Sequence, residues 1–218
     1  MEATDVKRQV EDNSIWRNSL WINKKEKVYF VPIWRNGNTS FMHLAEDNGF
    51  ELTRMTQCHL NSYTGFAFIR HPMKRITGQL YRAYENNNSE NVMPEMIGGN
   101  AWEPSDYKDA SLVIKGVEEL LEEAKKGNFM DAHMIPQYKF LENYSCKYII
   151  DLDKKSTVSH PFINKVLVDF YSRDSGILID GVYHHRQQTQ DRFIELVSID
   201  EETVKDIYEK DYELYESI

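Results

Sequence analysis

Three short apolar runs, each followed by a helical pattern, constrain the fold of this chain more than any other feature. The runs cover residues 28–33, 66–70 and 146–152, and their β-branched and aromatic side chains are typical of buried strands. Apolar residues at helical spacing predict helices over residues 39–47, 72–85, 108–126, 161–171 and 200–215. Because buried strands that alternate with helices favour parallel pairing, we predict an α/β fold with a mostly parallel sheet.

Length and composition set the next limits. The chain has 218 residues, of which 41% are hydrophobic and 28% charged, and this indicates a folded protein. The length predicts one domain over residues 1–218, in which residues 1–25 are an unassigned extension. The 35 acidic and 26 basic residues give a net charge of −9, so neither nucleic acid nor an anionic membrane is expected as the main partner.

The sequence also bears on location. The first residues show no signal-peptide pattern, and no apolar run approaches the ~18–20 residues of a membrane span. Cys58 and Cys146 are too few for a disulfide framework and do not form a CxxC pair. These features predict a soluble, cytoplasmic protein with two reduced thiols, and they give no indication of the oligomeric state.

The loop after the first predicted strand has the composition of an anion site. In such a strand–loop–helix segment the backbone N–H groups point at the anion, and the helix dipole favours negative charge. We therefore predict an anion site formed by Arg35, Asn36, Gly37, Asn38, Thr39 and Ser40. The same local structure is also common in α/β folds that bind nothing there. The GxxxxGK[ST] pattern of ATP-binding loops is absent, because the chain contains no Gly-Lys pair.

A second basic segment follows the second predicted strand. Arg70 ends that strand, where α/β folds place their ligands, and Arg75 lies about one turn into the next helix. Two arginines so placed can clamp a second phosphate. The alternative is that each of them forms an ordinary surface ion pair.

Together these segments resemble the 3′-phosphoadenosine-5′-phosphosulfate (PAPS)-dependent sulfotransferases, in particular the carbohydrate sulfotransferase branch. Residues 35–41, RNGNTSF, are similar to the family's PK-T-[AG]-[GS]-T-S loop, and residues 69–75, IRHPMKR, to its [VI]-R-[DHN]-P-x-x-R motif. Residues 133–137, HMIPQ, resemble its H-x-x-P-Q motif, and residues 207–215, IYEKDYELY, resemble its closing helix. The matches follow the family order and, with the first strand, span residues 28–215.

The resemblance implies a P-loop-like parallel sheet flanked by helices, the sulfotransferase fold. It implies transfer of a sulfuryl group from PAPS to a hydroxyl group of a saccharide without a metal ion. Animal members of the family are usually Golgi membrane proteins, and because no membrane anchor is recognisable in this sequence, we expect a soluble protein of bacterial or viral origin. Arg35 then supports catalysis and binds the donor with the rest of its loop, while Arg70 and Arg75 bind the 3′-phosphate. Arg35 replaces a lysine of the family and Gly78 replaces a serine, for which Thr77 or Arg75 is a substitute.

Sulfuryl transfer also needs a base that takes the proton of the acceptor hydroxyl. In related enzymes a histidine lies shortly before the strand that ends in the 3′-phosphate arginine, and His59 is the histidine in that interval. The resemblance therefore implies that His59 is the base. His133 is the second candidate, or else shapes the acceptor cleft, and Trp102 is a candidate for stacking on a sugar ring.

Two other functions stay open. A module that binds the nucleotide without transfer is indicated by Arg35 and Gly78, which replace functional residues of the family. A P-loop phosphoryl transferase is disfavoured by the missing Gly-Lys pair and by the lack of a recognisable magnesium site. Nucleotide binding without turnover would favour the first, and magnesium-dependent turnover of ATP would favour the second.

Overall fold

The computed structural model describes residues 19–54, 57–85, 110–129, 132–176 and 193–218. The chain divides into two compact units. Unit 1 comprises Met1–His71, Pro136–Leu178 and Glu213–Ile218, and unit 2 comprises Pro72–Ile135 and Ile179–Tyr212. The division is not evident from the sequence, from which a single domain is predicted, and each unit is described by itself.

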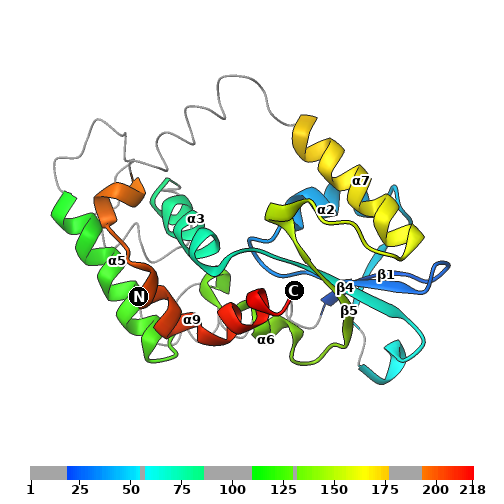
Figure 1. Cartoon of the computed structure of the whole chain (residues 1–218), viewed down its shortest axis with the longest axis horizontal. Coiled ribbons are helices and arrows are strands. Elements are labelled where there is room, and N and C mark those ends of the chain that lie inside the picture. The colour runs from blue at the N-terminus through cyan, green and yellow to red at the C-terminus, as the bar shows by residue number, and fades with distance from the viewer. Residues whose placement is uncertain (1–18, 55–56, 86–109, 130–131, 177–192) are drawn as a thin grey trace. The chain divides into compact units, whose positions relative to one another are not determined.

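Unit 1 is built on a five-stranded sheet with the order β3-β1-β2-β4-β5 (Figure 1). The three predicted strands, β2 (Val28–Val31), β4 (Thr64–Ile69) and β5 (Cys146–Asp151), pair in parallel. β1 (Ser19–Asn23) pairs antiparallel with both β2 and β3 (Glu51–Arg54). The α/β class is therefore confirmed, but the expected mostly parallel sheet is a mixed one, because β1 and β3 extend it with antiparallel pairs.

One face of the sheet is covered by α2 (Asn38–Ala45) and α7 (Pro161–Gly176), which pack against each other (Figure 1). The core beneath them consists largely of phenylalanine rings. Phe41 of α2 stacks on Phe30 of β2 with ring centroids 3.9 Å apart, and Phe170 of α7 lies 4.9 Å from Phe68 of β4. Because these rings join both helices to the strands, they fix the start of α2 at the carboxyl end of β2.

The opposite face of the sheet buries Tyr29, Ala67 and Ile69, which alternate with the phenylalanines along β2 and β4. The chain that follows α6 (Gln137–Leu141) packs on this side. The ring of Tyr144 lies 6.4 Å from that of Tyr29, and the Tyr29 hydroxyl donates to the carbonyl of Ser145 at 2.9 Å. These contacts hold the segment between α6 and β5 against β2.

Unit 2 is helical in its described part. It contains α3 (Pro72–Glu85), α5 (Ala110–Lys125), the short 3₁₀ turn η3 (Ala132–Met134) and most of α9 (Glu201–Glu216). Each helix buries one apolar stripe, and the core so formed includes Ile76, Leu80, Val113, Val117, Leu120, Met134, Val204 and Tyr208. α9 is kinked at Tyr208 (φ −118°, ψ 31°) and continues into unit 1 after Tyr212. The helices predicted over these segments are confirmed.

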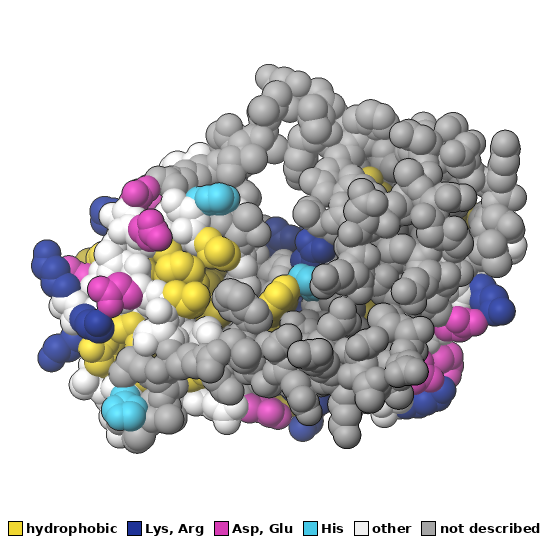
Figure 2. Space-filling model, turned by 180° about the vertical axis from the view of Figure 1, so that it is seen from behind, with side chains coloured by type: hydrophobic (Ala, Val, Ile, Leu, Met, Phe, Trp, Pro, Cys, Tyr) yellow, Lys and Arg dark blue, Asp and Glu magenta, His cyan; other side chains and the backbone are white. Residues whose placement is uncertain are grey.

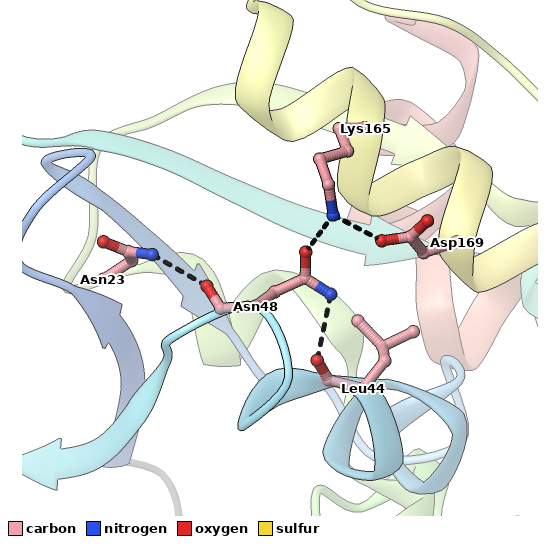
Figure 3. A network of polar contacts seen from close by, with 5 residues as sticks. All are labelled: Asn23, Leu44, Asn48, Lys165 and Asp169. Carbon is pink, nitrogen blue, oxygen red and sulfur yellow. Dashed lines mark hydrogen bonds and ion pairs between the residues drawn. The ribbon is translucent and has the colours of Figure 1, made fainter.

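An amide network lies at the amino end of β2 in unit 1 (Figure 3). The side chain of buried Asn48 donates to the carbonyl of Leu44 at 3.1 Å and accepts from Nζ of Lys165 at 2.7 Å. The Asn48 carbonyl accepts from Nδ2 of Asn23 at 2.8 Å, and Lys165 also pairs with Asp169 at 2.7 Å. The network joins β1, the end of α2 and α7.

Positively and negatively charged side chains are interspersed on the described surface (Figure 2). The ion pairs Lys24–Glu51 and Lys126–Glu123 join exposed or half-exposed groups, and such pairs add little stability. The fold therefore depends on the two apolar cores. None of the helices in the described part of the chain is both long enough and apolar enough to span a membrane.

Candidate anion-binding site

The loop between β2 and α2 turns through two left-handed residues. Arg35 and Gly37 have φ angles of 69° and 75°, and the N–H of Asn36 donates to the carbonyl of Ile33 at 3.1 Å. The first hydrogen bond of α2 runs from the N–H of Phe41 to the carbonyl of Gly37 at 2.8 Å. The N–H groups of residues 38–40 precede that bond and lack partners within the helix. They lie at the carboxyl end of β2, as an anion site requires.

Gly37 is required by both conformation and space. Its φ is left-handed, and a Cβ placed there would lie 2.7 Å from Cζ of Phe170 and 3.2 Å from Cδ1 of Leu152. A real Cβ essentially never lies within 3.0 Å of another heavy atom, so any larger residue would displace the Phe170 ring or the loop. The loop conformation is thus coupled to the packing of the phenylalanine core.

A buried pair of amides joins this loop to β4 and α6. Nδ2 of Asn36 donates to the carbonyl of Phe68 at 2.9 Å and to Oε1 of Gln137 at 2.6 Å. The same Oε1 accepts from the N–H of Arg70 at 3.0 Å, and Nε2 of Gln137 donates to the carbonyl of Arg70 at 3.0 Å. Both amide side chains are inaccessible to solvent. The structure therefore brings the loop that starts at Arg35 together with Arg70 at one edge of the sheet.

Arg70 supplies a positive charge at this edge. Its side chain is half-buried, and its Nε is buried with no hydrogen-bond partner among the described residues. Within the same part of the chain, Oδ1 of Asn36 and Oδ1 of Asn38 are also buried without a partner. A buried polar group left unpaired costs about 1–3 kcal/mol, and more if it is charged. The edge therefore suits a ligand that offers an anionic acceptor to the half-buried side chain of Arg70.

A carboxylate lies at the carboxyl end of β5. Asp151 is buried, and its oxygens accept from the N–H of Asp153 at 2.8 Å and from the hydroxyl of Tyr215 at 2.7 Å. Burial would raise the pKa of Asp151, but these bonds and the Lys154 ammonium, 3.3 Å away, outweigh it and hold the pKa below its ordinary value. Burial and the bond to the carboxylate raise the pKa of Tyr215 to about 12. The ring of His71 lies 5.0 Å from the ring of Tyr215, edge to face.

The Tyr215–Asp151 bond is expected to give unit 1 a stability that depends on pH. Tyr215→Phe is expected to destabilise unit 1 by about 1–2 kcal/mol near neutral pH, after allowance for solvent screening. Because the folded state raises the pKa of Tyr215 to about 12, this contribution is present below about pH 10 and is lost as the pH rises through about 12. Because the folded state lowers the pKa of Asp151, the contribution of its carboxylate is present above about pH 4 and is lost in more acidic solution, as the pH falls through the lowered pKa.

Urea unfolding of the wild type and of Tyr215→Phe at a series of pH values measures this effect. Hydrogen exchange in β5 near neutral pH shows whether the destabilisation lies in unit 1. The difference between the two proteins is expected to narrow between about pH 10 and about pH 12. A difference that stayed constant through that interval would show that the hydroxyl does not carry the stabilisation.

The predicted base, His59, lies elsewhere in unit 1. It belongs to the 3₁₀ turn η1 (Gln57–Leu60), which precedes β4, whereas Arg70 follows the carboxyl end of β4. The six residues of β4 span about 17 Å. The structure therefore does not bring the exposed His59 to Arg35 and Arg70. Its catalytic role stays a prediction from the sequence.

Arg75, predicted to bind the 3′-phosphate, is a buried residue of unit 2. Its side chain is 2% exposed, and Nη2 donates to the carbonyls of His133 at 2.9 Å and Ile135 at 2.7 Å. The hydroxyl of Thr77 donates to the carbonyl of Met73 at 2.8 Å, within α3. His133 itself is half-buried in η3. These bonds account for Arg75 as a residue that holds the chain around η3 to α3, and its role toward a nucleotide stays a prediction.

Two of the predicted positions lie outside the described residues: Trp102, and the side chain of Thr39. Conversely, three residues of the site were not predicted: the sequence suggests no role for Gln137, Asp151 or Tyr215. Gln137 and Tyr215 belong to segments that resemble family motifs, and Asp151 ends a predicted strand. That last position was a usable signal, because ligand-binding side chains gather at the carboxyl ends of parallel strands.

Two further findings bear on the function of this site. Among the described residues, no three His, Cys, Asp or Glu side chains are grouped so that they could hold a metal ion. No protein-family model, no curated protein and no solved structure matches the chain. The function must therefore be inferred from the residues at this edge of the sheet.

Proposed function

We propose that the chain is a sulfotransferase that transfers the sulfuryl group of PAPS to a hydroxyl group of a saccharide. One observation carries the proposal, namely the buried and unpartnered Nε of Arg70 beside the start of α2, at the carboxyl ends of parallel strands. The backbone of Arg70 is held on both sides by Gln137, so little freedom is lost when a ligand binds. The four motif resemblances support the same donor and the sulfotransferase fold.

The residues of this edge have distinct roles in the proposed reaction. The N–H groups in the first turn of α2 bind the 5′-phosphate end of the donor, and Arg70 binds the 3′-phosphate. Arg35 stabilises the negative charge that develops on the bridging oxygen as its bond to sulfur breaks. A new S–O bond forms to the acceptor oxygen, whose proton passes to a base, for which the sequence predicts His59.

The position of His59 favours a second candidate function, which is binding of the nucleotide without transfer. In the described part of unit 1 the loop and Arg70 are brought together, whereas His59 lies at the amino end of β4. An assay of sulfuryl transfer from PAPS to a panel of saccharides separates the two functions. Turnover supports the enzyme, and nucleotide binding without turnover supports the binding module.

The proposal is tested first by calorimetric titration with 3′,5′-adenosine bisphosphate (PAP), beside ATP with and without magnesium. We expect micromolar binding of PAP that is independent of magnesium and tighter than that of ATP. Arg70→Ala is expected to weaken PAP binding by about 10- to 100-fold, because a hydrogen bond to a charged group contributes about 1.5–3 kcal/mol.

Lys24→Ala is the matched control for this titration. It also removes one positive charge from unit 1, but at the turn before β2, where Lys24 pairs with Glu51 at 2.7 Å. The affinity of this variant for PAP is expected to stay within about twofold of the wild type, because loss of an exposed ion pair barely affects the fold. Absence of PAP binding, or equal losses in the two variants, would contradict the proposal. Magnesium-dependent turnover of ATP would indicate a phosphoryl transferase instead.

A further inference from the structure

We infer that Gln137 is a positioning residue that sets the spacing between Arg70 and the loop 35–37, which leads into the first turn of α2, so that both segments engage one ligand. The inference rests on the proposed function, in which that ligand carries two phosphate groups. Gln137 is not itself placed against the ligand. It acts through the two segments that its amide group connects.

The contacts of Gln137 with Arg70 copy a strand pairing. Its Oε1 accepts from the N–H of Arg70 and its Nε2 donates to the carbonyl of the same residue, both at 3.0 Å. One side-chain amide therefore continues the hydrogen bonding of β4 by one residue beyond Ile69, where the strand ends. This pairing fixes the backbone of Arg70, and with it the direction in which the guanidinium leaves the sheet.

The contact of Gln137 with Asn36 adds the loop to this arrangement. Oε1 of Gln137 accepts from Nδ2 of Asn36 at 2.6 Å, and the same Nδ2 donates to the carbonyl of Phe68 at 2.9 Å. Both amides are buried, so water does not compete for these bonds, and they are stronger than they would be at the surface. The loop and Arg70 are thus tied to each other through one amide oxygen.

The backbone around Gln137 keeps that oxygen in place. Gln137 is the first residue of α6, and Pro136 before it has a φ of −52°, which the proline ring itself restricts. Rotation of the side chain would break three hydrogen bonds to buried partners at once. The spacing of the two phosphate-binding segments is therefore built into the fold before any ligand arrives.

This arrangement predicts a selective loss of affinity. Gln137→Met removes the amide and keeps a side chain of similar length. Affinity for PAP, which must engage both segments, is expected to fall by at least about tenfold, because the second contact loses its effective concentration. Affinity for adenosine 5′-monophosphate, which has one phosphate, is expected to change by less than about threefold. Gln137→Asn, which keeps a polar group in the buried site, serves if the methionine variant does not fold.

A double variant tests whether Gln137 acts through Arg70. If it does, Gln137→Met added to Arg70→Ala is expected to reduce PAP affinity by less than about twofold further, whereas independent effects would multiply. A purely structural role would not produce this loss of additivity. It would lower the affinity for both nucleotides alike, in either background.

Asn48→Ala is the matched control, since it removes another buried amide of unit 1 that joins separate elements (Figure 3). It is expected to lower stability and to leave the ratio of the two nucleotide affinities unchanged. Equal losses for PAP and the monophosphate in Gln137→Met, or multiplicative effects with Arg70→Ala, would overturn the inference. Failure of the wild type to bind PAP would overturn the proposed function, so the two failures are distinguishable.

Discussion

Replacing Arg75 with methionine is expected to destabilise unit 2 by about 3–5 kcal/mol. The side chain is almost completely buried, and it donates to the carbonyls of His133 and Ile135. Methionine keeps the apolar stem but leaves both carbonyls without these donors. Each buried acceptor that loses its hydrogen bond costs about 1–3 kcal/mol. The change is measured by urea unfolding, with hydrogen exchange in α3 to locate it.

Two other variants of unit 2 calibrate that result. Lys74→Met makes the same kind of change on an exposed residue of α3 and is expected to alter stability by less than about 0.5 kcal/mol. Tyr208→Phe removes the hydrogen bond from the Tyr208 hydroxyl to the carbonyl of Met134, at 2.8 Å, and is expected to cost about 1–2 kcal/mol. If Arg75→Met folded with wild-type stability but lost PAP binding, Arg75 would be a nucleotide ligand, as the sequence predicts.

Gly37→Ala is expected to destabilise unit 1 by about 2–4 kcal/mol and to weaken PAP binding. A left-handed alanine costs about 1–2 kcal/mol. A Cβ only 2.7 Å from Cζ of Phe170 adds the cost of overpacking a core, about 1–3 kcal/mol. Phe170 lies against Phe68, so it cannot move without disturbing β4. Chemical unfolding gives the stability, and titration with PAP shows whether the loop has shifted.

Gly127→Ala separates the two contributions. Gly127 is also left-handed, with a φ of 82°, but nothing lies within 4 Å of the Cβ that alanine would add. It should therefore show the conformational cost alone, about 1–2 kcal/mol. Equal destabilisation by the two alanines would mean that α7 yields to the added carbon, and the loop would then not be coupled to the phenylalanine core.

The parts of the fold that could be predicted are those with a strong local pattern. The runs at β2 and β4 are continuous and apolar because both faces of these strands are buried, and the helices on either side carry one apolar stripe. β5, at the edge of the sheet, is less regular, because Lys147 within it is exposed. β3 has only the four residues ELTR, two of them charged, and its Leu52 is exposed. Such a short edge strand forms because β1 pairs with it. Pairing between segments distant in the sequence produces no periodic pattern of apolar residues that could predict the strand.

The candidate site shows the same limit. The loop after β2 and Arg70 were predictable, because each follows a recognisable strand. Gln137 was not, since its partners Asn36 and Arg70 are distant in the sequence. Arg75 has the spacing of a phosphate ligand in the sequence. Only the folded chain shows that Nη2 of its guanidinium already donates to two backbone carbonyls.

The division of unit 1 into three stretches of chain determines the order in which its parts leave the ribosome and can fold. β2, α2 and β4 emerge early, but the partner of β4 on its other side, β5, follows only after Pro72–Ile135 has been synthesised. Until then Phe66 and Phe68 lack Ile150 and the α7 side chains that complete their core. Nascent chains stalled within the first stretch of unit 2 should therefore depend on chaperones that shield apolar surface, and that dependence should end once α7 has emerged.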